Sequence, residues 1–88
     1  MKLIFLHGLG QDAHSWQGVQ DALSPLQSES FAIFSHPSES YQEAKERLTE
    51  HLQQESEPFI LVGLSLGGVL ALDLSSRDLQ QLKGLVLS

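Results

Sequence analysis

A serine between two glycines carries the strongest chemical signal in the sequence. Gly63, Ser65 and Gly67 form the pattern G-x-S-x-G, which follows an apolar run ending at Val62 and precedes an apolar helical pattern. A serine at such a strand–helix junction lies on a tight turn, with its hydroxyl exposed above the carboxyl edge of the sheet. The two glycines are required because side chains there would collide where strand and helix backbones pass closely. The pattern therefore predicts that Ser65 is a nucleophile for attack on an acyl carbon.

A second motif offers the hydrogen-bond donors that such a reaction needs. Attack on an acyl carbonyl creates an oxyanion, which requires two preorganised N–H donors. The backbone N–H of Leu66, at the start of the helix, is predicted to be one donor. The backbone N–H of Leu9 is predicted to be the other, because Gly8 and Gly10 let the loop after the first strand turn its amides toward the site. His7 precedes this loop, and its ring is expected to bond to loop backbone.

The positions of these motifs depend on strands and helices that alternate along the chain. Short continuous apolar runs predict buried strands at residues 2–6, 31–34, 59–62 and 84–87. Helical spacing of apolar residues predicts helices at residues 15–23, 41–54 and 66–75. Asp12 or Ser15 is expected to cap the first helix, and Ser40 is expected to open the second in a capping box.

This alternation predicts an α/β fold with three layers, α/β/α, and a four-stranded parallel sheet in the order 2-1-3-4. The first and third strands are then neighbours, and ligands bind outside the carboxyl ends of strands at such a switch point. The loops with Leu9 and Ser65 leave these two strand ends, so the two motifs meet at one crevice. His14 and His36 lie on loops at the same edge and are candidate pocket residues. Trp16 is a further candidate, although a core anchor is the more common role of such a tryptophan.

Composition limits the class of protein. The length of 88 residues allows one domain, and a net charge of −6 argues against binding to a phosphate backbone. The absence of cysteine excludes disulfides and thiolate metal sites, and no metal or cofactor is expected. The apolar stretches are far shorter than the roughly 20 residues of a membrane span, and no signal peptide is recognisable. A cytoplasmic location follows. The acidic residues gather between Glu39 and Glu57, where a solvated helix face with an exposed His51 is expected.

A competing motif overlaps the first loop. Residues 8–13 also fit G-x-G-x-x-A, the dinucleotide-binding fingerprint. That function requires an acidic residue at the end of the second strand, but the first acid there, Glu39, lies beyond Pro37. Dinucleotide binding also leaves the motif around Ser65 unexplained. A P-loop is a separate possibility for that motif, but the Lys-Ser/Thr that a P-loop requires is missing. Dinucleotide binding is therefore the weaker hypothesis.

The segments LIFLHGLGQDAHSW and LVGLSLGGVLAL resemble the N-terminal half of the α/β-hydrolase superfamily, in particular its small bacterial esterase-like members. Those proteins have an HG-x motif after an early strand and a G-x-S-x-G elbow further on. The resemblance implies a serine hydrolase that cleaves small-molecule esters or thioesters without a cofactor. It also implies that Ser65 is the nucleophile and that Leu9 and Leu66 are the oxyanion donors.

The sequence departs from that superfamily after the nucleophile. The superfamily places an acid and then a histidine after the serine. Here Asp73 and Asp78 are the only acids after Ser65, and all four histidines precede it. We therefore expect the chain to be the N-terminal portion of a longer hydrolase, inactive by itself. The alternative is a non-catalytic half-domain that associates through the strand from Gly84 to Leu87, as a homodimer or with the missing half.

Overall fold

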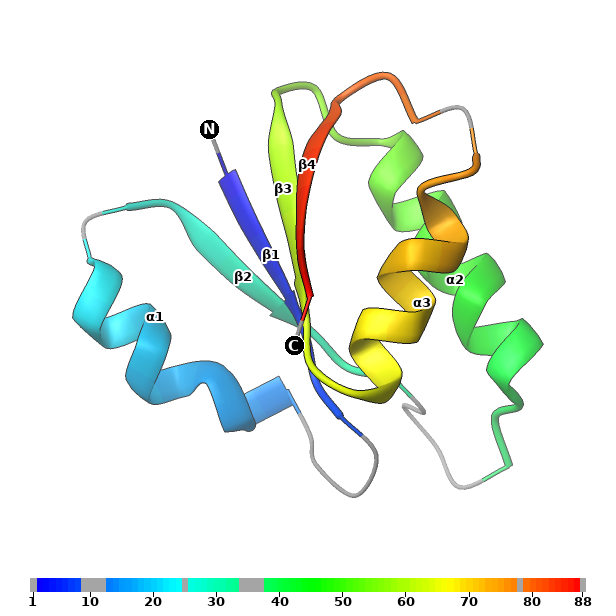
Figure 1. The fold of residues 1–88 in the computed structure, drawn as a ribbon, viewed down its shortest axis with the longest axis horizontal. Helices are drawn as coiled ribbons and strands as arrows, with labels where there is room; N and C mark the ends of the chain where they lie inside the picture. Colours follow the sequence, from blue (N-terminus) through cyan, green and yellow to red (C-terminus); the bar gives the residue numbers. More distant parts are fainter. Residues whose placement is uncertain (1, 9–12, 25, 34–37, 78, 88) are drawn as a thin grey trace.

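The computed structural model describes residues 2–8, 13–24, 26–33, 38–77 and 79–87 (Figure 1). The strands are β1 (Lys2–Leu6), β2 (Ser28–Phe31), β3 (Phe59–Gly63) and β4 (Leu82–Leu87). The helices are a 3-10 turn η1 (Ala13–Trp16), α1 (Gln17–Leu23), α2 (Tyr41–Gln53) and α3 (Leu66–Leu74). Strands and helices thus alternate as the sequence predicts.

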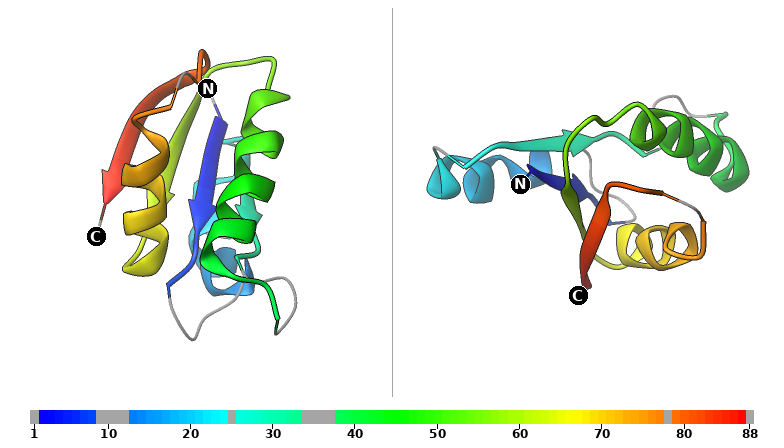
Figure 2. Two further views of the ribbon diagram at one scale, coloured as in Figure 1. Left: turned by 90° about the vertical axis from the view of Figure 1, so that its right-hand side faces the viewer. Right: turned by 90° about the horizontal axis from the view of Figure 1, so that it is seen from above.

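The four strands form one parallel sheet in the order β2-β1-β3-β4, which confirms the predicted topology. The turn η1 packs on one face of the sheet, with α1 following it on that side, and α2 and α3 cover the other face (Figures 1 and 2). β1 and β3 are neighbours in register, with Leu6 opposite Gly63. The loops that follow these two strands therefore leave the same edge of the sheet side by side.

The main core lies between the sheet and the pair α2 and α3. Alternate residues of the central strands point into it, together with the apolar faces of both helices. Its fully buried members include Ile4, Leu6, Phe59, Leu61, Leu48, Leu70 and Leu74. On the opposite face, the Phe5 ring stacks on Trp16 of η1, with ring centroids 4.8 Å apart. β1 is therefore buried on both faces, as its continuous apolar run predicts.

The predicted capping box at the start of α2 is confirmed. The Glu43 N–H donates to the Ser40 hydroxyl at 3.1 Å, and the Ser40 N–H donates to the Glu43 carboxylate at 3.0 Å. These two bonds satisfy two backbone N–H groups that the start of a helix otherwise leaves to water. The buried face of the helix then follows at Ala44, Leu48 and Leu52, spaced at one turn.

The predicted position of the second strand is wrong. We expected residues 31–34, whereas β2 is Ser28–Phe31 and pairs with β1 from Leu3 to Leu6. The Ile33 N–H donates to the side chain of His7, not to the backbone of β1. β2 lies at the edge of the sheet and is only half-buried, so polar residues are tolerated in it. A continuous apolar run is typical of strands that are buried on both faces. A half-buried edge strand such as β2 lacks this run, so its position cannot be predicted in that way.

The expected cap of the first helix is also not found. α1 begins at Gln17 after η1, and its N-cap residue, Trp16, makes no side-chain capping bond. Ser15 therefore does not cap α1, and Asp12 lies outside the described residues. The predicted apolar stripe of this helix is exposed, with Val19 at 42% and Leu23 at 36%, so α1 buries none of its residues.

Candidate active site at the Ser65 turn

Ser65 has the backbone conformation that a strand–helix elbow requires. Its φ is 55° and its ψ is −115°, and it has the only positive φ of a non-glycine residue in the described parts of the chain. Such a conformation costs about 1–3 kcal/mol and is typical of functional turns. The residue is exposed, occupies the N-cap position of α3, and makes no side-chain capping bond. The hydroxyl is therefore left to solvent at the carboxyl edge of the sheet.

Close backbone contacts allow only glycine at the two glycine positions of the motif. A Cβ on Gly63 would lie 2.5 Å from the Gly67 carbonyl oxygen, and a Cβ on Gly67 would collide with the Leu6 carbonyl oxygen. The Leu64 N–H donates to that same Leu6 oxygen at 3.2 Å. The turn around Ser65 is therefore pressed against the end of β1, and only glycine fits at both positions.

His7 is buried at 3% exposure, and both of its ring nitrogens have backbone partners. Nδ1 lies 3.0 Å from the Gly8 carbonyl oxygen, and the Ile33 N–H donates to Nε2 at 2.8 Å. The expected bonding of this ring to backbone is therefore present. The contact with Ile33, which follows β2, had no signal in the sequence. With both nitrogens engaged, His7 is not available as a general base for Ser65.

The remaining predicted site residues divide into three groups. Leu66 is the first residue of α3, directly after Ser65. Three predicted residues, Leu9, Gly10 and His36, lie outside the described residues. His14 is exposed in η1, while Trp16 stacks on Phe5 in the core on the α1 face.

Asp73, one of the two acids after Ser65, is engaged elsewhere. Its carboxylate lies 2.9 Å from the Lys45 ammonium and accepts a hydrogen bond from the Tyr41 hydroxyl at 3.0 Å. The bond from Lys45, followed by the bond from Tyr41, holds the pKa of Asp73 below its ordinary value of 3.8. Burial, followed by the bond to Asp73, raises the pKa of Tyr41. Asp73 therefore joins α3 to α2 and does not face Ser65 as a triad acid.

The lowered pKa of Asp73 predicts a pH-dependent contribution to stability. Because the folded pKa lies below the unfolded value of 3.8, this carboxylate stabilises the fold above that pH. The contribution is lost as the pH falls through the folded pKa. Urea denaturation should show that Asp73→Asn destabilises the protein more at about pH 6 than at about pH 3. Glu50→Gln, an exposed change on α2, is the control. An equal effect of Asp73→Asn at both pH values would contradict the prediction.

A cluster of charged residues joins β1, β2 and the end of α2. Glu29, His51 and Glu55 have ligand-type atoms within 4.8 Å of one another. The Lys2 ammonium contacts both carboxylates, at 2.8 Å from Glu55 and 3.5 Å from Glu29, and the Glu55 bond raises the pKa of Lys2. The Nε2 atom of His51 lies 2.7 Å from Glu29, and its ring packs on Phe31. His51 is therefore a half-buried surface residue: 40% of its side chain is exposed, and its ring also packs against β2.

The buried acid Glu39 is also accounted for. Arg47 donates two hydrogen bonds to its carboxylate, both at 2.9 Å, and a third to the carbonyl of Ala32. The Arg47 guanidinium also lies 4.5 Å from the centre of the Phe31 ring. Glu39 therefore fixes the connection from β2 to α2 and is not free to bind a ribose, which weakens the dinucleotide hypothesis further.

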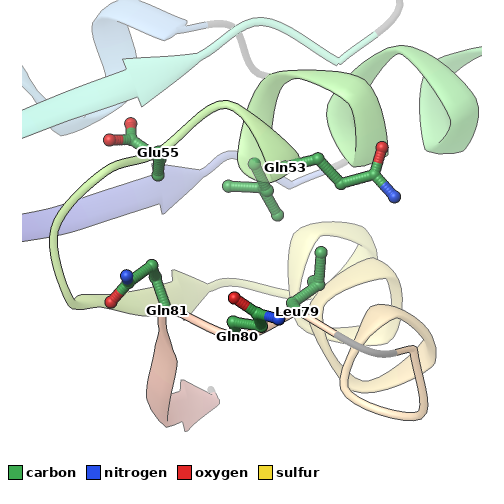
Figure 3. Close-up of a pocket in the computed structure, with 6 residues that line it drawn as sticks. Gln53, Glu55, Leu79, Gln80 and Gln81 are labelled. Carbon is green, nitrogen blue, oxygen red and sulfur yellow. The ribbon is translucent and has the colours of Figure 1, made fainter.

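A cavity of about 210 Å³ opens at the other end of the sheet (Figure 3). It lies between the end of α2 and the segment before β4, and Leu52 and Leu79 are its apolar lining residues. The other lining residues are Gln53, Glu55, Gln80 and Gln81. They include no nucleophile and no histidine, and Glu55 is already paired with Lys2. The serine that the sequence predicts to be a nucleophile therefore lies at the other end of the sheet, outside this cavity.

Comparisons with known proteins agree with this geometry. The sequence matches the alpha/beta hydrolase family over residues 3–88. The fold resembles the crystal structure of the haloalkane dehalogenase DbeA-M1 loop variant from Bradyrhizobium elkanii, with a TM-score of 0.80 at 21% sequence identity. That similarity covers 98% of this chain and 32% of the dehalogenase, so the chain spans about a third of that protein. The comparison with curated proteins found no match.

Among the described residues, every helix falls short of the length and apolar character of a membrane span. The match extends over almost the whole sequence. The chain belongs to the α/β hydrolase family.

Proposed function

We propose that this chain carries the nucleophile half of a serine hydrolase that cleaves small-molecule esters or thioesters. The observation that supports it most is the conformation of Ser65, an exposed serine held at positive φ between β3 and α3. A strained conformation at that position has no structural benefit of its own, whereas it presents a hydroxyl to a substrate. A cytoplasmic location stays a prediction from the sequence.

The proposed reaction assigns one role to each residue of the turn. The Oγ of Ser65 attacks the acyl carbon, and the alcohol or thiol of the substrate leaves. The N–H of Leu66, at the positive end of the α3 dipole, stabilises the oxyanion together with the N–H of Leu9. The pairing of β1 with β3 supports this assignment, because the end of β1 lies beside the end of β3, where Ser65 follows.

The proton acceptor is proposed to lie beyond the residues of this chain. No histidine follows Ser65 in the sequence, both ring nitrogens of His7 are engaged, and Asp73 is paired with Lys45. We therefore propose that residues 1–88 are the N-terminal portion of an α/β-hydrolase domain and that the triad acid and histidine belong to another segment. By itself the chain would react slowly, because an unassisted serine hydroxyl is a poor nucleophile.

A fluorophosphonate probe tests the proposal, with imidazole added as a diffusible base in place of the absent histidine. We expect labelling that depends on Ser65 and rises with imidazole concentration. Ser76→Ala, a change of an exposed serine after α3, is the matched control and should label like the unaltered chain. Equal labelling of the unaltered chain and Ser65→Ala at every imidazole concentration would refute the assignment of the nucleophile, and the family membership would stand.

A second candidate function is association through β4. The two edges of the sheet differ: β2 is short and polar, and its Glu29 is paired with Lys2 and His51. β4 has six residues, mostly apolar, and Val86 and Leu87 are 54% and 46% exposed. An apolar edge strand of this kind pairs readily with another chain. This contrast supports a half-domain that forms a homodimer through the strand from Gly84 to Leu87.

A charge on the β4 edge should therefore prevent association. Val86→Lys is expected to weaken the homodimer at least about 10-fold, because a lysine on an edge strand opposes strand pairing. Val69→Lys makes the same change at a residue of α3 that is 60% exposed and should leave the dimer intact. Light scattering over a concentration series measures both. A monomeric unaltered chain at the highest concentration would contradict the association.

A further inference from the structure

The cavity beside the amino ends of β3 and β4 combines an apolar surface with two polar walls (Figure 3). Leu52 and Leu79, which are only 2% and 9% exposed, supply the apolar surface. Sites for drug-sized molecules have volumes of roughly 300–1,000 Å³. This cavity, at about 210 Å³, is smaller, so it suits a ligand no larger than a single amino acid.

The wall formed by the end of α2 attracts positive charge. Leu52 and Gln53 are the last residues of α2, and the carboxyl end of a helix carries a partial negative charge. Among the described residues, no group donates a hydrogen bond to the Gln53 carbonyl oxygen. Glu55 lies on the same side of the cavity (Figure 3). The carboxylates of Glu55 and Glu29 share the one ammonium of Lys2, at 2.8 and 3.5 Å, so Lys2 neutralises one of two negative charges.

The opposite wall is the segment before β4, and it attracts negative charge. The backbone N–H groups of Gln80 and Gln81 donate to no group in the described parts of the chain. The Lys83 ammonium donates to the Gln80 carbonyl oxygen at 3.1 Å, so a positive charge lies next to these donors. Figure 3 shows Gln80 and Gln81 across the cavity from Gln53 and Glu55. The two walls therefore favour ligand groups of opposite charge.

We propose that this cavity binds a small zwitterionic α-amino acid with an apolar side chain. The ammonium group of the ligand lies at the end of α2, where Gln53 and Glu55 offer acceptors. The carboxylate of the ligand accepts hydrogen bonds from the N–H groups of Gln80 and Gln81, and its side chain covers the two leucines. An amine or an acid alone would pair with one wall only, whereas a zwitterion pairs with both. The site lies at the other end of the sheet from Ser65, so binding there does not depend on the proposed hydrolase chemistry.

An NMR titration of the chain with L-leucine at millimolar concentrations tests the proposal. The amide signals of Gln53, Gln80 and Gln81 should shift, and those around Ser65 should not. Two matched probes each lack one charged group: 3-methylbutylamine has no carboxylate, and 4-methylpentanoic acid has no ammonium. Each should bind at least about 10-fold more weakly than leucine, because each loses the charge-assisted hydrogen bonds to one wall. No shift with leucine, or equal affinity for leucine and either analogue, would overturn the proposal.

Two variants separate the walls. Lys83→Met should weaken leucine binding at least about 3-fold, because it removes an exposed charge beside the carboxylate, and it should not weaken binding of 3-methylbutylamine. Glu55→Gln should weaken binding of leucine and of the amine, but not of the acid. Glu50→Gln makes the same change at an exposed residue of α2 outside the cavity lining and should change none of the three affinities.

The selectivity of the two losses distinguishes binding from stability. Glu55 also pairs with Lys2, so circular dichroism must show that Glu55→Gln is folded. If that variant does not fold, Lys83→Met, a change of an exposed residue, decides alone. An equal loss of affinity for all three ligands in the folded variants would mean that the walls do not recognise the two charged groups, and would overturn the proposal.

Discussion

Gly67→Ala is expected to destroy the native fold or to leave it barely stable. The new Cβ would collide with the carbonyl oxygen of Leu6 and lie 2.7 Å from that of His7. Both obstacles are backbone atoms at the end of a central strand, so neither moves without breaking the β1–β3 ladder. Overpacking of a core costs about 1–3 kcal/mol and sometimes more. Here we expect at least about 3 kcal/mol, measured by urea denaturation followed by circular dichroism.

The control for this variant is Gly18→Ala in α1. A Cβ on Gly18 meets no atom within 4 Å, and alanine is the better helix former, so we expect a gain of about 0.5–1 kcal/mol. If Gly67→Ala lowers the stability and Gly18→Ala raises it, the loss at Gly67 comes from the steric contact and not from the helix propensity of alanine. A Gly67→Ala protein as stable as the unaltered chain would show that α3 does not press on β1 as described.

Ser65→Ala is expected to lower covalent labelling at least about 100-fold without loss of stability, because the reacting oxygen is removed. The Ser65 side chain makes no capping bond and is exposed, so its removal costs the fold little. Ser65→Gly should lose the label equally and also raise stability by about 1 kcal/mol, because glycine adopts a φ of 55° without strain.

The comparison of these two variants tests the strain directly. If Ser65→Gly and Ser65→Ala have the same free energy of unfolding, the turn is not strained. Conversely, strong labelling of either variant would mean that another side chain reacts. Mass mapping of the labelled peptide would then identify it.

Much of the fold could be predicted because local and global signals agree. The capping box at Ser40, the apolar run of β1 and the motif around Ser65 each depend on neighbouring residues. Those are the interactions that a sequence displays directly. The strand order then followed from the rules for parallel sheets. The sequence predicts close backbone contacts at both glycines of the elbow. It does not predict that the contact of Gly67 is with Leu6 at the end of β1.

The failures share a physical cause, which is contact between residues distant in sequence. The position of β2 is predicted wrongly because this edge strand pairs with β1 alone and carries polar residues. One of them, Glu29, pairs with Lys2 of β1 and His51 of α2. The two partners of the His51 ring, Phe31 and Glu29, have no signal in the sequence near His51. The bond between His7 and Ile33 spans 26 positions, and no local pattern encodes it. Each case needed the arrangement of the sheet before its residues could be paired.

Acetyl transfer from p-nitrophenyl acetate tests most directly whether Ser65 is a nucleophile. The Oγ attacks the ester carbonyl, p-nitrophenolate leaves, and added imidazole takes the proton, so one acetyl group remains on the protein. Peptide mass spectrometry should find that acetyl group on Ser65, at a rate that rises with imidazole and vanishes in Ser65→Ala. Acetylation confined to lysines or to other serines, at a rate unchanged in Ser65→Ala, would contradict the proposed role of the turn.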